Sequence, residues 1–115
     1  KVSLISKAPN YVQQVSNPIK ADAASLGKGK KLYVANCAEC HGDKGNGKGP
    51  LASRIRPRPA NLRNKKEMDK YTDGAIFWAI DTGGGKMVSF HDTLSQEDIW
   101  NLTNYIRFLP QEKPK

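Results

Sequence analysis

The sequence has few of the residues on which disulfide frameworks and membrane spans depend. Its 115 residues include only two cysteines, so a small fold held by several disulfides is excluded. No apolar run approaches the ~20 residues that a bilayer-spanning helix needs, and we therefore expect no membrane span. The length fits a single domain with a small core.

Acidic side chains are also scarce relative to basic ones. The chain has 11 Asp and Glu against 19 Lys and Arg, a formal net charge of +8. The excess is concentrated between Lys44 and Lys70, where nine basic residues stand with two acidic ones. Such a one-sided field favours encounters with acidic partners, although an ordinary solvated surface would have the same composition. No nucleic-acid-binding motif accompanies the charge, so we expect no nucleic-acid partner.

Both cysteines lie in the pentapeptide Cys37-Ala38-Glu39-Cys40-His41, which has the spacing C-x-x-C-H. This spacing is typical of covalent haem c attachment. Residues three apart on a helical turn share one face, so both thiols can reach the edge of one planar ligand. Each thiol would form a thioether bond to one haem vinyl group, and His41 is placed to bind the iron. The pentapeptide therefore predicts one covalently bound haem c.

Two other uses of the pentapeptide are weaker. A structural zinc site needs four ligands, and its histidines usually form a close pair, whereas His41 and His91 stand far apart. A thioredoxin-like redox pair also has the spacing C-x-x-C, but it occurs in a βαβ setting. No strand-like alternation surrounds Cys37. The haem interpretation is favoured over these, and over a chance occurrence, because later segments supply the other parts of a haem site.

Two properties of the whole chain agree with a bound haem. The hydrophobic fraction of 37% and the mean hydropathy of −0.67 are low for this length, and a macrocycle would supply apolar surface that side chains otherwise provide. The sequence opens with Lys1 and has no signal-like segment, which fits an export product whose signal has been removed, or a chain shortened at its start. Because haem c is generally attached after export, we expect a periplasmic or other extracytoplasmic compartment.

Helical spacing and capping residues predict three helices in a domain over residues 22–110. The first begins at Asp22 or Ser25 and runs to about Cys37, and its Gly29 suggests that another helix crosses closely there. The second runs from Thr72 through Ile80 and is apolar nearly all round. The third begins at Ser95 and stops at Pro110. We expect residues 1–21 to be an extension packed on the body and residues 111–115 to be a polar tail.

The second axial position of the iron decides the function. Met87 lies in a glycine-rich loop, which would let the backbone approach the macrocycle, whereas Met68 lies in a charged stretch. We therefore favour Met87, with His91 as the rival ligand. A His/Met pair raises the reduction potential and a bis-histidine pair lowers it. An open position would instead allow a small gas to bind.

At these residues the chain resembles the monohaem class I c-type cytochromes, which are small bacterial electron carriers. The resemblance covers about residues 25–109. It implies an all-α fold in which the N- and C-terminal helices cross and short middle helices and loops surround one haem. It is carried by the pentapeptide together with the following residues: Gly29, Tyr33, Gly49-Pro50-Leu51, Met87, Phe90, Leu102 and Tyr105.

The resemblance also implies roles for further residues of the haem site. The carbonyl of Pro50 would accept a hydrogen bond from the proximal histidine, and Trp78 would line the haem pocket or meet a propionate. The proline-punctuated stretch 56–61 is placed to run beside the haem edge, so we expect Arg56, Arg58 or Asn61 to contact a propionate. The chain departs from the family in having Val88 where a proline often follows the axial methionine.

The resulting expectation is an exported electron carrier, not an enzyme, whose iron cycles between two oxidation states with His41 and Met87 as axial ligands. Its partners would be a donor and an acceptor redox protein, with acidic docking faces. Two alternatives remain at this point. The chain could be a haem c subunit of a larger redox enzyme, or a ligand-binding or sensing cytochrome with a labile sixth site.

Overall fold

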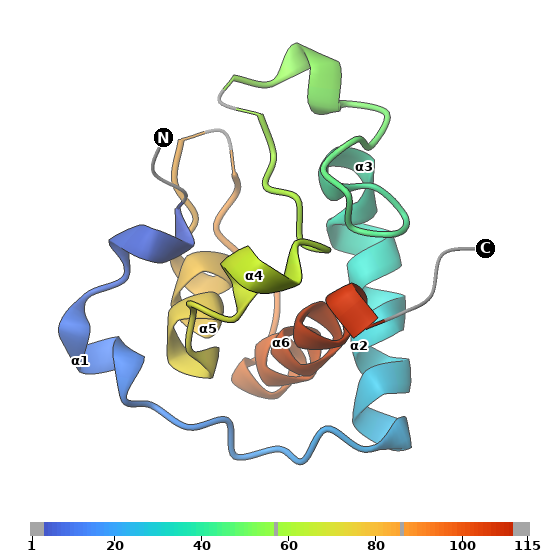
Figure 1. Ribbon diagram of the computed structural model, residues 1–115. Coiled ribbons are helices and arrows are strands. Elements are labelled where there is room, and N and C mark those ends of the chain that lie inside the picture. Colours follow the sequence, from blue (N-terminus) through green and yellow to red (C-terminus); the bar gives the residue numbers. More distant parts are fainter. Residues whose placement is uncertain (1–3, 57, 86, 112–115) are drawn as a thin grey trace.

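Three long helices form the frame of the computed structural model, which describes residues 4–56, 58–85 and 87–111 (Figure 1). Among these residues the only strand pairing is one isolated bridge between Gly84 and Met87. The predicted all-α class is therefore confirmed. The long helices are α2 (Ala23–Asn36), α5 (Asp73–Thr82) and α6 (Gln96–Phe108). The short helical segments are η1 (Ile5–Lys7), α1 (Asn10–Gln13), α3 (Ala38–His41), η2 (Ala52–Arg54), α4 (Lys65–Met68) and η3 (Leu109–Gln111).

Each long helix begins at a predicted capping residue. The side chain of Asp22 accepts a hydrogen bond from the backbone N–H of Ser25, and Thr72 caps α5 in the same way. Ser95 caps α6 through a reciprocal pair of hydrogen bonds with Asp98. These side chains satisfy N–H groups that have no partner within the helix. The helix starts therefore follow from the local sequence.

The crossing of α2 and α6 is the central packing contact of the fold, and it depends on Gly29. A Cβ atom on Gly29 would lie 2.3 Å from the carbonyl oxygen of Asn101 and 2.7 Å from Cβ of Tyr105. Next to this contact the rings of Tyr33 and Tyr105 pack with centroids 5.5 Å apart. The prediction that another helix crosses at Gly29 is confirmed, because only a residue without a side chain allows this approach.

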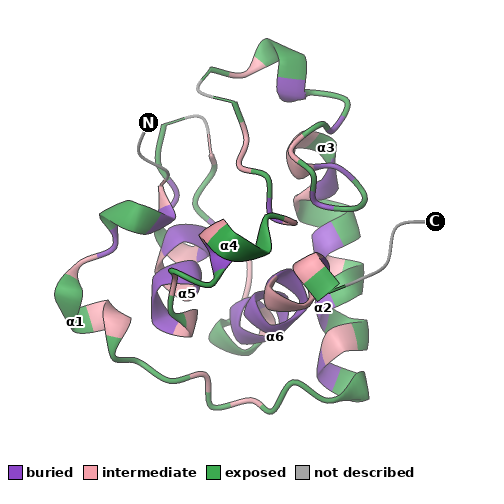
Figure 2. Cartoon of the chain, in the orientation of Figure 1, coloured by how far each residue is buried: buried purple, intermediate pink, exposed green. Residues whose placement is uncertain are grey.

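The middle of helix α6 is buried on all sides, beyond the apolar stripe that its sequence predicts. Every residue from 99 to 106 is buried (Figure 2). The polar members of this run are satisfied by a hydrogen-bonded network. Ser25 donates to the Oδ1 of Asn101 at 2.6 Å, and Asn104 donates to the Oγ of Ser25 at 2.9 Å. The network joins the first turn of α2 to α6.

The N-terminal segment runs along the outside of α5 and α6 (Figure 1). Ile5 and Ala8 are buried in the core, and the Nδ2 of Asn17 donates to the carbonyl of Trp100 at 3.1 Å. On α5, a Cβ atom on Gly74 would meet the carbonyl oxygen of Val12. This segment therefore packs closely on the body. Parts of the predicted extension and tail, residues 1–3 and 112–115, lie outside the described residues.

Helix α4 is a short element that the sequence analysis did not predict. Asn64 caps it by accepting a hydrogen bond from the backbone N–H of Glu67 at 3.1 Å. Lys65 and Asp69 pair on its outer side at 2.7 Å. The helix turns Met68 into the core, where it is only 4% exposed. Met68 is therefore a packing residue, although charged side chains surround it in the sequence.

Candidate functional site

The C-x-x-C-H pentapeptide spans the junction between α2 and α3. Cys37 ends α2 with its N–H bonded to the carbonyl of Tyr33 at 2.8 Å, and its own φ of −122° changes the chain direction. Its carbonyl then accepts from the N–H of His41 at 3.0 Å, which closes the single turn α3. Cys37, Cys40 and His41 are all half-buried. The turn thus places two thiols and an imidazole on a short rigid element at the end of a long helix.

The thiols do not resemble a reactive redox pair. Both cysteines are free and do not form a disulfide with each other. Burial, with a smaller contribution from Cys40, raises the pKa of Cys37 to about 12. Redox-active C-x-x-C motifs instead lower the pKa of one thiol, and they do so at favourable sites such as helix N-termini. Among the described residues there is also no cluster of three or more potential metal-binding His, Cys, Asp and Glu side chains. Neither alternative use of the pentapeptide is therefore supported.

One nitrogen of His41 is occupied by a backbone carbonyl. Its Nδ1 lies 3.0 Å from the carbonyl oxygen of Ala60, and a carbonyl can only accept, so Nδ1 carries the proton. Burial lowers the pKa of His41, while the bond to Ala60 acts in the opposite direction. The neutral ring leaves the Nε2 lone pair available for a metal.

The predicted role of Pro50 is wrong. The carbonyl that accepts from His41 belongs to Ala60, and Pro50 is exposed. The reason is that the loop after α3 is used differently: the N–H groups of Gly47, Gly49 and Leu51 bond to the carbonyls of His41, Cys40 and Glu39 at 2.7–3.1 Å. Residues 47–51 therefore cap the C-terminus of α3, and the carbonyl that meets the ring of His41 comes later in the chain, at Ala60.

Met87 lies in a loop that leaves α5 at Gly83 and returns to it at Phe90. Gly84 and Met87 exchange two backbone hydrogen bonds, of 3.0 and 2.9 Å. Phe90 is buried, and its N–H bonds back to the carbonyl of Ile80 at 3.1 Å. Met87 itself is half-buried and packs against the core. The loop is thus a closed structure with Met87 anchored on its returning side.

His91, the rival axial ligand, pairs with the last turn of α5. Its Nδ1 lies 2.9 Å from Oδ1 of Asp81, and its side chain is 68% exposed. The hydrogen bond and the charge of Asp81 raise the pKa of His91 above its ordinary value of 6.5. This arrangement holds His91 at the surface beside Asp81.

The hydrogen bond between His91 and Asp81 makes the stability of the folded protein depend on pH. Because the folded state raises the pKa of His91, its contribution to stability is complete below pH ~6.5 and is lost as the pH rises through the raised value. We expect an NMR titration of the reduced protein to place His91 above 6.5 and the Asp81→Asn variant to lower that value. An unchanged titration in the variant would show that Asp81 does not interact with the imidazole in solution.

The remaining predicted site residues are not gathered in one pocket by the structure. Arg56 is exposed and donates to the carbonyls of Ser53 and Ile55 in its own loop, at 3.0 and 3.1 Å. Arg58 and Asn61 are exposed as well. Trp78 lines a cleft of about 410 Å³ between the N-terminal segment, α5 and α6. Contacts of these residues with a haem stay predictions.

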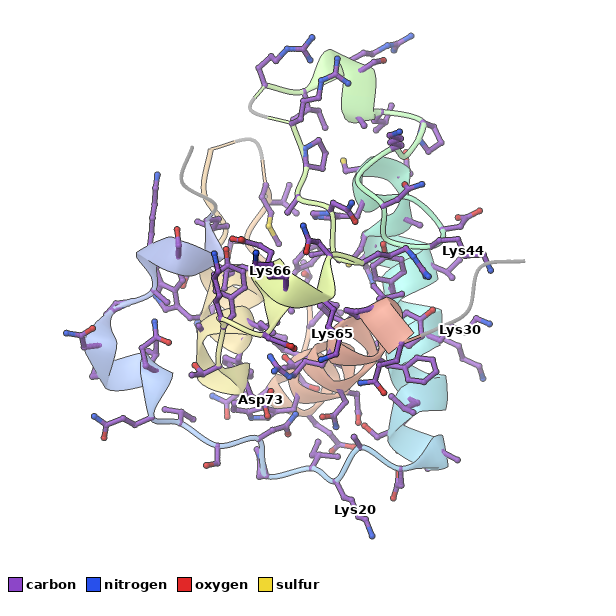
Figure 3. All side chains as sticks on the ribbon, in the orientation of Figure 1. Lys20, Lys30, Lys44, Lys65, Lys66 and Asp73 are labelled. Atoms are coloured by element: carbon purple, nitrogen blue, oxygen red, sulfur yellow. The ribbon has the colours of Figure 1, made fainter. Side chains whose placement is uncertain are left out.

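The basic residues are spread over several elements. Figure 3 shows Lys44 in the loop after α3 and Lys65 and Lys66 on α4. Two of the nine basic residues between positions 44 and 70, Lys65 and Lys70, pair with acidic residues of their own segment. The remaining charge is concentrated in the exposed segment around η2, which projects at the top of Figure 1. It carries Lys48, Arg54, Arg56 and Arg58.

Comparison with known proteins assigns the chain to a family. The family described as cytochrome c oxidase, cbb3-type, subunit III matches residues 24–106. The chain belongs to these c-type cytochromes. Solved c6 and cL cytochromes have the same all-α fold. A covalently bound haem c is thus the cofactor, attached through Cys37 and Cys40.

Individual relatives match this cytochrome over different shares of their own length. Cytochrome c6 of Cladophora glomerata is 32% identical over 90 residues, which cover 74% of this chain and 89% of the relative. The cbb3-type oxidase subunit FixP of Azorhizobium caulinodans is 32% identical over 106 residues, covering 91% of this chain but 34% of FixP. A chain from the Kuenenia stuttgartiensis reducing HAO-like protein complex superposes with a TM-score of 0.70 and 28% identity, covering 83% and 49% of the two chains. The cytochrome thus spans about a third to a half of two of these relatives.

The donor set of this cytochrome fits haem c. Two free thiols stand three residues apart on one turn, and the adjacent imidazole has its Nδ1 satisfied and its Nε2 available. Sequence reasoning missed Ala60, because a carbonyl acceptor carries no side-chain signal. Within the part of the chain that is described, no helix is long and apolar enough to cross a membrane.

Proposed function

We propose that this cytochrome transfers single electrons between two redox proteins, with His41 and Met87 as axial ligands of its haem iron. The observation that carries the proposal is the bond between Nδ1 of His41 and the carbonyl of Ala60, which fixes the tautomer that a metal ligand needs. When bound, haem c supplies a reversible one-electron Fe(III)/Fe(II) couple. The polypeptide contributes the ligands, a dry environment and a docking surface.

Met87 is the better of the two methionine candidates. Its loop is anchored at both ends to α5 and it is half-buried, whereas Met68 is committed to the core under α4. The rival His91 is exposed and paired with Asp81. These placements favour a His/Met pair, which raises the reduction potential relative to a bis-histidine pair.

A weak band at the red end of the visible spectrum of the oxidised protein indicates an iron–methionine bond, and we call it the red-end band. We expect Met87→Ala to abolish this band and to lower the midpoint potential of the protein. The reason is that the thioether is the source of that band and stabilises the reduced iron. Absorption spectra of both oxidation states and a potentiometric titration measure the two effects. Sharp α and β bands in the reduced wild-type protein would establish low-spin haem c.

Met68→Leu is the matched control, because Met68 is the only other methionine. A swap of similar volume in the core costs less than ~1.5 kcal/mol, so the variant should fold and keep the red-end band. Loss of the band in Met68→Leu but not in Met87→Ala would transfer the ligand role to Met68. Absence of the band in the wild-type protein, together with CO binding to its reduced form, would favour a labile sixth site.

The exposed basic segment around η2 is the proposed docking surface for an acidic partner. Lys48, Arg54 and Arg58 make no ion pair with any other described residue, so their charge is available to a partner. Long-range attraction of this kind raises association rates and is screened by salt. Turnover with a donor and an acceptor would occur in the periplasm or another extracytoplasmic compartment, where haem c is attached.

A second candidate function is that of a haem subunit in a larger redox enzyme. The match to FixP, a cbb3-type oxidase subunit, and the match to a chain of a Kuenenia complex favour it. Native mass spectrometry of material purified from its source separates the two. A stable partner of fixed stoichiometry would support the subunit, and a monomer would support the free carrier.

A further inference from the structure

The loop that carries Met87 also completes the C-terminus of α5. The last carbonyls of a helix have no partner within it. In α5 the carbonyl of Ala79 accepts from the N–H of Gly83, and that of Ile80 accepts from the N–H of Phe90. The carbonyl of Asp81 accepts from the hydroxyl of Ser89 at 2.7 Å. The returning end of the loop therefore supplies two of the three caps.

The two ends of this loop cross in close contact. Gly83 has a φ of +68°, and a Cβ atom there would lie 2.7 Å from the backbone nitrogen of Ser89 and 2.8 Å from the carbonyl oxygen of Val88. Only glycine combines this conformation with this approach. Because the crossing is tight, a displacement of residues 89–91 would also displace Met87, two positions before Ser89.

A hydrogen-bonded pair of Asp81 and His91 lies across the same junction. Asp81 is in the last turn of α5, where a carboxylate is unfavourable because the helix dipole is negative there. The imidazole of His91 offsets this with a hydrogen bond of 2.9 Å to Oδ1 of Asp81. The Oγ of Ser89 accepts from the N–H of His91 at 3.3 Å. Ser89, Asp81 and His91 therefore form one hydrogen-bonded unit, which we call the α5 clasp.

We propose that the α5 clasp positions the axial-ligand loop, with Asp81 and His91 as positioning residues that hold Met87 against the iron. The proposal rests on Met87 being the axial ligand and adds what keeps it in place. His91 would then act on the iron through the loop instead of binding it. Opening of the clasp would free the loop and let an external ligand compete for the iron.

The test is imidazole binding to the oxidised holoprotein, followed by loss of the red-end band. When a site is blocked most of the time, apparent affinity scales with the fraction of molecules in which it is open. Asp81→Ala and His91→Ala should each lower the half-saturating imidazole concentration about tenfold. The double variant should resemble the single ones, because each substitution already breaks the same pair.

Asp92→Ala is the matched control. The substitution removes the same charge beside His91. The charge of Asp92 also raises the pKa of His91, but among the described residues the Asp92 side chain has no hydrogen bond or ion pair. It should bind imidazole like the wild-type protein. Retention of the red-end band without imidazole shows that each variant has folded. A general loss of stability would affect imidazole binding in Asp92→Ala as well, whereas opening of the clasp would affect only Asp81→Ala and His91→Ala.

The outcomes separate the clasp from the ligand assignment. If Met87→Ala abolishes the band but Asp81→Ala and His91→Ala bind imidazole like the wild-type protein, the clasp proposal fails and Met87 stands. If Asp92→Ala lowers the half-saturating imidazole concentration as much as Asp81→Ala does, the lost surface charge accounts for the effect and the clasp proposal fails. If Met87→Ala keeps the band, both proposals fall.

Discussion

Replacing Cys37 and Cys40 together by serine is expected to give a colourless polypeptide. Serine hydroxyls do not form the thioether bonds that hold haem c, and His41 alone would leave a dissociable cofactor. After expression with haem-attachment machinery, mass spectrometry should show the mass of the bare amino acids, and the visible spectrum should lack the Soret band. The change is all or none, which makes it the largest effect expected for any variant of this cytochrome.

The single variants Cys37→Ser and Cys40→Ser are the controls, since each keeps one of the two thiols of the pentapeptide. We expect either to retain some covalent haem, with a mass above that of the bare polypeptide. The double variant should also lose helical structure, because the side chains alone provide a hydrophobic fraction of only 37%. A double variant that keeps its colour after denaturation in acidified solvent would show that attachment does not run through these cysteines.

Sequence reasoning was most successful where a feature depends on neighbouring residues. The caps Asp22, Thr72 and Ser95 are local signals, and each occurs at the start of its helix. The C-x-x-C-H pentapeptide is also local, because its chemistry needs nothing beyond one helical turn. Gly29 is intermediate: its cost within a helix indicates a close crossing, and the partner α6 came from the family resemblance.

The contact of His41 could not be predicted because it lies 19 residues away and involves a backbone atom. Any residue has a carbonyl, so Ala60 has no distinguishing side chain. Pro50 was chosen from the resemblance, but the segment 47–51 uses its N–H groups to cap α3. Only the three-dimensional path of the loop decides which carbonyl meets the ring.

Burial of polar residues was likewise beyond local patterns. Asn101 and Asn104 lie off the apolar stripe of α6, yet both are buried because α2 and the N-terminal segment cover that face. Their amides are satisfied by Ser25, Asn17 and the carbonyl of Ile19. A pattern of apolar residues indicates one buried face, and it cannot show that a second face is covered by a polar network.

A second large effect, on the free energy of unfolding, is expected at the crossing of α2 and α6. We expect Gly29→Ala to destabilise the protein, because its methyl group would lie 2.3 Å from the carbonyl oxygen of Asn101. Overpacking of a core typically costs ~1–3 kcal/mol. The clash here is with backbone, which cannot rotate away, so this cost should exceed the ~1 kcal/mol that alanine gains over glycine in a helix. Urea denaturation of the oxidised holoprotein measures the change.

Gly27→Ala is the matched control on the same helix, two residues earlier. A Cβ atom at Gly27 would meet nothing within 4 Å, so this variant receives only the helix-propensity gain of up to ~1 kcal/mol. Both variants receive this gain, so their free energies of unfolding should differ by the cost of the clash alone, ~1–3 kcal/mol, with Gly27→Ala the more stable. Equal stabilities would mean that α2 and α6 can separate at Gly29 at little cost. In that case the α2–α6 crossing could not be what fixes Cys37, at the end of α2, relative to the rest of the core.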